Sequence, residues 1–414
     1  MATPSITMIP SGYKAQKVYS VLPTNGDGDF TFDRNNIGTR VNKNGLIEQL
    51  ATDIPRLDYS DGSCPSLLLE PSSTNLFNYS QDFSQSDWFK SSSVATGGIL
   101  IPDGTNSGYK LVVDNGVNAS AVGAGLRREV NLTAGIFYTY SVFVKKAELY
   151  NTTVLIDGVN NNEVSYSFDL NNGSMIRESI KGNYTDTSYS IKEYESGWWR
   201  VSISFKPTAT ATVKSYVWHF KNNDYTDDIG DGVNGIYVWG AQFEALPYAT
   251  SYIPTTIQPA SRGVDSAFKD GLSSYISSTS GVLYAEFAAL SNEDNTFRVF
   301  SLSDGGSVNR IFIGFDSSND VYASIGGEFI QDFTPTDATD FIKAAIKYED
   351  NNSKLFVNGN QISTTNTTAT VPSGLNRLGF DSGAGSSRFH VKTKDLRVYN
   401  TALTDAELIT LTTI

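Results

Sequence analysis

The sequence predicts an all-β protein in which two antiparallel β-sandwiches follow an extended N-terminal arm. The chain has 414 residues, more than the roughly 250–300 that a single hydrophobic core serves. Its 35 Gly, 22 Tyr and 23 Phe favour strands and turns over helices. Short apolar segments with alternating side chains also recur between turn residues, which is typical of sandwiches.

The boundary between the two sandwiches is predicted from the stretch GIYVWGAQFEALPYATSYIPTT, residues 235–256. Ile236–Phe243 has the β-branched and aromatic composition of a strand. Pro247 and Pro254 follow, and neither can donate a hydrogen bond to a β-ladder. A strand that leads into a proline-stiffened exit indicates a domain boundary. We therefore expect an arm over residues 1–84 and sandwiches over residues 85–256 and 257–414.

The arm is rich in proline and glycine. A hairpin turn is predicted at Asn42–Gly45. The apolar run Leu67–Leu69 lies between Pro65 and Pro71 and is expected to dock against a folded body or a neighbouring subunit. Such a segment buries its own apolar groups poorly, so it becomes ordered on a partner subunit or capsid. The alternative is that the arm packs on its own domain.

Strands of the first sandwich are predicted from alternation between turns. In Tyr138–Val144 and Trp198–Phe205, apolar side chains recur at every second position, as in antiparallel sheets with one buried face. The predicted strands are 109–113, 126–130, 138–145, 153–156, 164–169, 189–194, 198–205, 215–220 and 236–243.

Strands of the second sandwich follow the same reasoning. The dipeptide Asn358-Gly359 predicts a tight hairpin turn. Thr404 and Glu407 have the spacing of a capping box, which predicts a short C-terminal helix. The predicted strands are 281–290, 296–301, 310–315, 321–325, 341–348, 354–357, 377–380 and 389–399.

Charge and composition exclude several classes of protein. The net charge is −13 and the pI about 4.7, so a polyanion such as DNA is repelled and nucleic-acid binding is not expected. Cys64 is the only cysteine, so no intrachain disulfide forms. The N-terminus shows no apolar core of a signal peptide, and no apolar run reaches the length of a membrane span. Synthesis in a cytoplasm, without membrane insertion, is expected.

Several phrases resemble a module of tailed-phage and prophage structural proteins. They are GTRVNKNGLIE, PRLDYSDGSCPSLLLEP, TNLFNYSQDF, YVWGAQFE and ATSYIPT, within residues 11–264. The resemblance implies a bacteriophage virion protein at the particle surface, such as a tail-fibre, head-fibre or capsid-decoration subunit. Its implied partners are other virion proteins of the capsid, portal or tail, and homo-oligomers, trimers included, are common among such parts.

Each predicted sandwich also resembles a known fold. SQSDW at residues 84–88 and WWRVSISF at residues 198–205 are similar to jelly rolls of the carbohydrate-binding-module type. IKYEDNNSKLFVNGNQI, RLGFDSG and DLRVYNTALTDAELITL resemble, in this order, the laminin-G/concanavalin-A-like lectin sandwich over residues 265–414. The resemblance implies glycan binding, often with calcium, although many such domains are purely structural.

Tryptophans are the first candidates for glycan binding, because exposed aromatic rings stack on sugars. Trp199 and Trp239 alternate with apolar neighbours and are expected in the core. Trp198 faces away from Trp199, and Trp88 lies in a polar stretch. We take Trp88 and Trp198 as candidate glycan platforms, with burial in the core as the alternative.

An acidic loop is the candidate metal site. Asp224, Asp227, Asp228 and Asp231 crowd the segment NNDYTDDIGDGVNG, and hard cations such as calcium prefer several oxygen ligands. An ordinary acidic surface loop is the alternative. Calcium is therefore the one cofactor the sequence suggests.

Catalysis is not expected. His219 and His390 are the only histidines, each within a predicted strand, and no Ser-His-Asp order is recognisable. Cys64 has no nearby histidine, and no phosphate-binding glycine motif occurs. We therefore expect a virion fibre or decoration subunit, attached through its arm, that binds host-surface glycans. A purely architectural capsid or tail protein is the alternative, and a polysaccharide depolymerase is a third.

Overall fold

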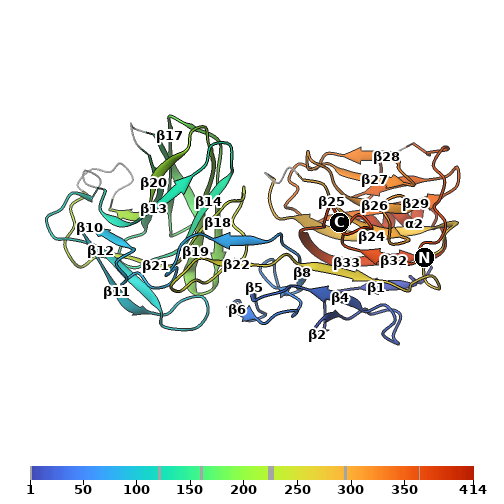
Figure 1. Ribbon diagram of the computed structural model, residues 1–414, viewed down its shortest axis with the longest axis horizontal. Helices are drawn as coiled ribbons and strands as arrows, with labels where there is room; N and C mark the ends of the chain where they lie inside the picture. The colour runs from blue at the N-terminus through green and yellow to red at the C-terminus, as the bar shows by residue number, and fades with distance from the viewer. Residues whose placement is uncertain (1, 120–122, 159–161, 222–227, 293–295, 363) are drawn as a thin grey trace. The chain divides into compact units, whose positions relative to one another are not determined.

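The computed structural model describes residues 2–119, 123–158, 162–221, 228–292, 296–362 and 364–414. Over these residues the chain is almost entirely antiparallel β-structure, which confirms the predicted all-β class. It forms two compact units, each with its own sheets (Figure 1). Unit 1 comprises Met1–Ile37, Leu50–Ser72 and Gly263–Ile414, and unit 2 comprises Gly38–Gln49 and Ser73–Arg262.

Unit 1 contains an eight-stranded and a nine-stranded sheet. The first has the order β31-β30-β29-β24-β33-β8-β7, with β1 paired to β33, and the second β2-β3-β4-β23-β32-β25-β26-β27-β28. The strands of the first sheet are β1 (Ile6–Met8), β7 (Leu57–Asp58), β8 (Ser66–Leu68), β24 (Ser280–Ala289), β29 (Ile342–Glu349), β30 (Lys354–Val357), β31 (Asn360–Gln361) and β33 (Val391–Tyr399). Those of the second are β2 (Tyr13–Lys14), β3 (Lys17–Val18), β4 (Phe30–Asp33), β23 (Ser266–Lys269), β25 (Arg298–Ser303), β26 (Arg310–Phe315), β27 (Val321–Ile325), β28 (Glu328–Phe333) and β32 (Arg377–Gly379).

The core of unit 1 follows from the alternation of its strands. In β26, Ile311, Ile313 and Phe315 are fully buried and point inward, while Arg310 and Phe312 lie on the opposite face. The inward-facing residues of β24 in the same core are Leu283, Ala285 and Phe287. Fully burying a large apolar side chain stabilises the fold by about 1.5–3 kcal/mol, so this core fixes which face of each strand points outward.

Two local predictions for unit 1 are confirmed. Asn358 and Gly359 both have positive φ and connect β30 to β31 as a tight hairpin turn. α2 (Asp405–Thr412) begins at Thr404, whose hydroxyl accepts from the Glu407 backbone N–H while the Glu407 carboxylate accepts from the Thr404 N–H. The helix covers the outer face of the eight-stranded sheet through Leu408 and Leu411.

Unit 2 is built from two six-stranded sheets, ordered β10-β13-β20-β15-β16-β17 and β11-β12-β21-β14-β19-β18. Their strands are β10 (Phe89–Ser91), β11 (Ser93–Ile99), β12 (Gly108–Val113), β13 (Gly125–Leu132), β14 (Tyr138–Lys146), β15 (Asn151–Asp157), β16 (Glu163–Asp169), β17 (Ser174–Lys181), β18 (Tyr184–Tyr194), β19 (Trp198–Pro207), β20 (Ala211–Phe220) and β21 (Gly235–Glu244). Two smaller pairs, β5 (Gly38–Val41) with β6 (Ile47–Leu50) and β9 (Ser73–Asn75) with β22 (Ala260–Arg262), complete it.

The N-terminal segment differs from the predicted arm over residues 1–84. Residues 1–37 and 50–72 supply strands to both sheets of unit 1, while residues 38–49 and 73–84 belong to unit 2. Ile6, Phe30, Phe32 and Leu67 are almost completely buried in the core of unit 1. The segment is therefore divided between the two units, and its buried apolar residues pack within its own chain.

The three longest of the described strands that have no counterpart in the sequence prediction are β11, β17 and β28. Most of their side chains are exposed or half-buried, so they lack the apolar alternation by which strands are recognised. Within the described part of the chain, no helix is both long and apolar enough to cross a membrane.

Candidate functional site

Trp88, one of the two predicted glycan platforms, lies in the core of unit 2. It is 1% exposed, and its ring packs edge-on against Phe77 and Phe83 with centroids 5.3 Å and 4.9 Å away. The indole N–H donates to the carbonyl of Tyr79 over 2.9 Å. Because both faces and the polar atom are occupied within the protein, Trp88 is corrected to a core residue.

Trp198, the second predicted platform, is also buried, with 0% of its surface exposed. Its ring does face away from the main core, as its alternation with Trp199 predicts. However, Ile47 from the β5–β6 pair, Ile101 and Tyr252 pack over this outer face and enclose the ring. Residues that are far apart in the sequence thus cover a face of the strand that the local pattern predicts to be exposed. The prediction that Trp198 is a glycan platform is therefore corrected, because Trp198 is a buried residue.

The predicted calcium loop is only partly described. Asp224 and Asp227 lie outside the described residues. Asp228 is 3% exposed and accepts the backbone N–H of Lys221 over 3.1 Å. Asp231 accepts the N–H groups of Val233 and Asn234, which lowers the pKa of its carboxyl. The carboxylates of Asp228 and Asp231 therefore accept hydrogen bonds from backbone N–H groups of this region. Among the described residues, no cluster of three metal-ligating side chains occurs.

His219 faces the interior of unit 2, on the same side of β20 as the core residues Val213 and Val217. Burial lowers the pKa of its imidazole to about 4. The ring is 3% exposed and therefore stays neutral near pH 7. A buried imidazole without access to solvent is not placed for acid–base chemistry on a bound substrate.

A group of aromatic side chains lies instead on the outer face of the nine-stranded sheet of unit 1. We define the aromatic face as Phe297, Arg310, Phe312, Tyr322 and Phe329. The strands β26, β27 and β28, which carry its last four residues, are adjacent in the sheet (Figure 1). Phe312, Ser324 and Phe329 stand opposite one another in a single cross-strand row.

Three rings of the aromatic face, those of Phe297, Tyr322 and Phe312, are joined by edge-to-face contacts. Tyr322 lies between Phe297 and Phe312, with ring centroids 5.6 Å and 5.1 Å away. Phe297 is 47% exposed and Phe329 is 54% exposed, whereas Phe312 is buried. Two large aromatic side chains of this surface are thus exposed to solvent, while the side chain of Phe312 is held in place by the residues around it.

Arg310 supplies the polar component of the aromatic face. Its guanidinium carbon lies 5.0 Å from the centre of the Phe312 ring, and Nη1 donates to the carbonyl of Ser382 over 2.7 Å. Burial raises the pKa of the Tyr322 hydroxyl to about 12, so at neutral pH this group is a neutral donor and acceptor. The face therefore combines apolar rings with directed hydrogen-bonding groups, as binding sites for small polar molecules do.

A sequence signal for the aromatic face does exist. In RIFIGF, residues 310–315, the positions Ile311, Ile313 and Phe315 alternate and predict the buried side. The same alternation puts Arg310 and Phe312 on the outer face. The prediction from tryptophans points to unit 2, which contains all five of them, and therefore does not include these phenylalanine and tyrosine rings.

Part of unit 1 matches a known protein family. Residues 279–409 match the concanavalin A-like lectin/glucanases superfamily, which confirms the lectin-like domain expected there. The match contains β24 to β33 and most of α2, and therefore all five residues of the aromatic face. No curated protein matches the sequence.

Solved structures similar to this chain include three carbohydrate-related proteins. One is the CBM40 domain of the Ruminococcus gnavus IT-sialidase, with 18% identity over 33% of this chain and 84% of that chain and a TM-score of 0.26. Another is domain 4 of AbnA, a GH43 extracellular arabinanase from Geobacillus stearothermophilus, in complex with arabinotriose, with 18% identity, 40% and 82% coverage and a TM-score of 0.28. The third is Trypanosoma rangeli sialidase with the inhibitor DANA, with 10% identity, 69% and 52% coverage and a TM-score of 0.30.

Proposed function

We propose that this protein binds glycans through the aromatic face of unit 1. The observation that carries the proposal is the pair of solvent-exposed rings, Phe297, which packs against Tyr322, and Phe329, which lies on the neighbouring strand β28. The C–H groups of a pyranose form an apolar patch that packs on the negative face of an aromatic ring. Arg310 lies at the edge of the same surface, where its N–H groups donate to sugar hydroxyls.

The lectin-like assignment of residues 279–409 supports this proposal, because the aromatic face lies within that domain. The charge of the chain supports a neutral glycan as ligand. With a net charge of −13, the protein repels polyanionic polysaccharides at low ionic strength. The aromatic face needs no charge on its ligand, because stacking on rings depends on C–H groups alone.

The proposal includes binding without cleavage, with a polysaccharide depolymerase as the alternative. Glu286 on β24 stands directly opposite Asp395 on β33, and facing carboxylates about 5–5.5 Å apart are the machinery of retaining glycosidases. However, Asp395 is 7% exposed and accepts two hydrogen bonds from Arg397. Glu286 also faces Lys343 on the neighbouring strand. We therefore interpret the pair as part of a structural charge network.

The biological setting is a further part of the proposal and rests on sequence resemblance alone. We propose that the protein is a surface subunit of a tailed-phage virion, a fibre or decoration protein, and that it is present as a homo-oligomer. A purely architectural capsid or tail protein is the alternative. Mass spectrometry of purified particles tests the setting, because a virion subunit copurifies with the capsid and a free protein does not.

Binding to a glycan array and to host cells tests the proposed function. The test variant is Phe297→Ala combined with Phe329→Ala, which removes the two exposed rings. The matched control is Ile409→Ala, because Ile409 is 41% exposed and lies on α2, on the other sheet of the same unit. We expect saturable binding by the wild type and the control and at least tenfold weaker binding by the double variant. Equal binding by all three proteins contradicts the assignment.

A further inference from the structure

The edge strand β28 contains a β-bulge at the aromatic face. In a regular strand, residues three positions apart point to opposite faces of the sheet. The register of β27 and β28 shifts between Ala323 and Ser324, which leaves Ile330 as an extra, buried residue on β28. Bulges of this kind redirect the side chains around them and are frequent at sheet edges and beside functional sites.

The bulge brings Phe329 and Asp332, three positions apart, to the same face of the sheet. Phe329 stands opposite Ser324, and Asp332 stands opposite Tyr322. Directly opposite side chains of antiparallel strands point to one face, with their Cβ atoms about 4.5–5.5 Å apart. Both Phe329 and Asp332 are exposed to solvent. Asp332 therefore lies beside Tyr322 at the margin of the aromatic face, on strand β28 (Figure 1).

The carboxylate of Asp332 has free acceptor capacity. Among the described residues it accepts one hydrogen bond, from Nε2 of Gln331 over 3.4 Å, whereas an ionised carboxylate has about four acceptor sites. Asp316, which follows β26, differs because its Oδ1 accepts the backbone N–H groups of Ser318 and Asp320. Hydroxyl groups that donate to a carboxylate form hydrogen bonds roughly twice as strong as those between neutral groups. Asp332 can therefore accept from a ligand without breaking a contact within a turn.

Donor and acceptor groups lie on opposite sides of the rings. Arg310 belongs to β26 and Asp332 to β28, and β27 with Tyr322 lies between these strands. Neighbouring strands are about 4.7–4.9 Å apart, so β26 and β28 are separated by two such spacings. A glycan that lies across the three strands meets N–H donors first, then aromatic rings and then a carboxylate acceptor.

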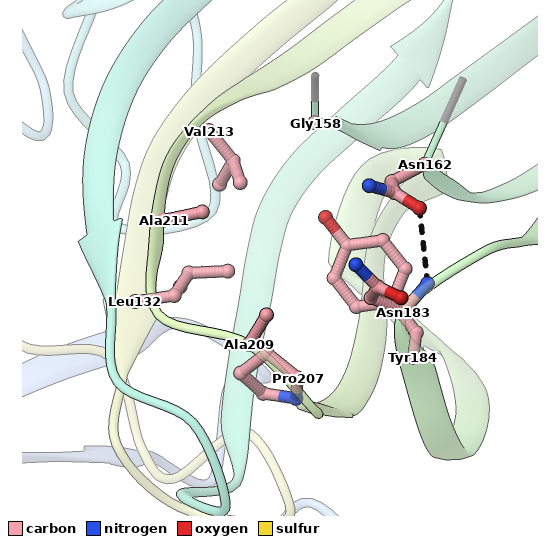
Figure 2. Close-up of a pocket in the computed structure, with 9 residues that line it drawn as sticks. All are labelled: Leu132, Gly158, Asn162, Asn183, Tyr184, Pro207, Ala209, Ala211 and Val213. Atoms are coloured by element: carbon pink, nitrogen blue, oxygen red, sulfur yellow. Dashed lines mark hydrogen bonds between the residues drawn. The ribbon is translucent and has the colours of Figure 1, made fainter. Parts of the chain in front are cut away.

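The pocket at one end of unit 2 lacks such an arrangement (Figure 2). Among the described residues that line it, Tyr184 supplies the only aromatic ring and is 9% exposed. Oδ1 of Asn162 accepts the backbone N–H of Asn183 over 3.0 Å. The apolar lining residues are Leu132, Pro207, Ala209, Ala211 and Val213. Because stacking on a sugar requires an exposed ring, glycan specificity is assigned to the aromatic face.

We propose that Asp332 makes the aromatic face selective for neutral glycans whose stacked sugar has two adjacent free hydroxyl groups. This selectivity rests on the proposed function of that face. Each of the two hydroxyls donates to one oxygen of the carboxylate, while the C–H groups of the sugar pack on the exposed rings. Where a glycosidic bond occupies one of these hydroxyls, one hydrogen bond is lost and a carboxylate oxygen is desolvated without a donor.

Affinity electrophoresis of the full chain tests the selectivity. Dextran, β-1,4-galactan and glucomannan have internal sugars with adjacent free hydroxyls, whereas the internal sugars of laminarin, a β-1,3-glucan, have none. We expect at least one of the first three to retard the protein in native gels, and laminarin to bind roughly tenfold more weakly. Equal binding of laminarin overturns the proposal. So does a wild-type protein that binds to the glycan array but to none of the first three polysaccharides.

The variant Asp332→Asn assigns the selectivity to this carboxylate. It keeps the size of the side chain but removes the charge, and we expect roughly tenfold weaker binding of the retained polysaccharide. The preference over laminarin is expected to fall as well, which a merely structural role would not cause. The matched control is Glu328→Gln, because Glu328 is exposed on the same strand but stands opposite the core residue Ile325 and points to the other face. Far-UV circular dichroism shows whether each variant is folded.

The variants separate this selectivity from the proposed function. If Asp332→Asn binds like the wild type while the variant with Phe297→Ala and Phe329→Ala binds weakly, the rings bind glycans and the role of Asp332 is wrong. If the double variant also binds like the wild type, the proposed function fails, and the selectivity fails with it.

Discussion

Arg56 and Asp265, 209 positions apart in the sequence, form a fully buried ion pair in unit 1. The same guanidinium donates to Glu70, and Asp265 also accepts from Arg34 over 3.3 Å and from the Glu70 backbone N–H over 2.8 Å. The two carboxylates raise the pKa of Arg56, so it stays charged. This network connects the N-terminal segments of unit 1 to the beginning of its C-terminal segment.

Asp265→Ala is expected to destabilise unit 1 by about 3–5 kcal/mol, because removing one partner of a buried pair leaves an uncompensated charge inside. Here Arg34 and Arg56 both lose a carboxylate. Urea unfolding followed by far-UV circular dichroism measures the change. The control is Asp270→Ala, whose side chain is 59% exposed and pairs with Arg377, and for which a loss below about 1 kcal/mol is expected. Equal losses in the two variants contradict a special role of the network.

Removing residues 1–84 is expected to unfold unit 1. The deletion takes away β1, β4 and β8 and exposes the apolar residues against which they pack. Ile6, Phe30 and Leu67 alone account for several kcal/mol of burial. The measurement is soluble expression and size-exclusion chromatography of residues 85–414. A soluble, monodisperse fragment with a cooperative unfolding transition would show that the N-terminal segment is dispensable. That result is what a separate docking arm predicts.

Acid is expected to destabilise unit 2 through His219. In the unfolded chain the imidazole has a pKa near 6.5, whereas burial lowers it to about 4 in the fold. The unfolded state therefore binds more protons between these values, so stability falls as the pH drops from about 6.5 to about 4. The full effect of the shift is about 3 kcal/mol, at 1.36 kcal/mol for each pKa unit.

Comparing wild type with His219→Leu isolates this contribution. Carboxyls with a lowered pKa, such as Asp82 at about 2, also lose stability in acid, but they do so in both proteins. Urea midpoints from tryptophan fluorescence at pH 7.5, 6, 5 and 4.5 give the difference. We expect the wild type to lose stability faster than the variant below pH 6.5. Parallel curves would show that His219 does not titrate in the way its burial indicates.

Sequence patterns predict strands well where one face is buried. β26, β27 and β30 agree with prediction to the residue. The apolar side chains of β26 and β27 alternate, whereas β30 has three consecutive buried residues and is followed directly by the Asn358-Gly359 turn. β17 was not predicted, since Arg177, Glu178 and Lys181 are exposed and a strand that covers no core shows no period. The sequence pattern therefore predicts only those strands whose own side chains are buried in the core.

The candidate sites were less predictable, because exposure depends on residues far away in sequence. Trp198 has the local pattern of an outward-facing ring, yet Ile47 and Tyr252 cover it. Phe297 directly precedes β25 and Phe329 lies on β28, and only the pairing of β25, β26, β27 and β28 places them on one surface. Sequence supplies these residues but not the contacts that expose or bury them.

Trp198→Ala distinguishes a buried tryptophan from a surface platform. Because the ring packs against Phe143, Trp239 and Tyr252 within one cluster, its removal leaves a cavity and is expected to cost about 3–5 kcal/mol. Fluorescence of the remaining tryptophans during urea unfolding measures this loss in unit 2. Glycan binding, measured on the array at a temperature where the variant is folded, is expected to equal that of the wild type. A variant with wild-type stability but weakened glycan binding would show the reverse: that the ring is open to solvent and contacts the sugar directly.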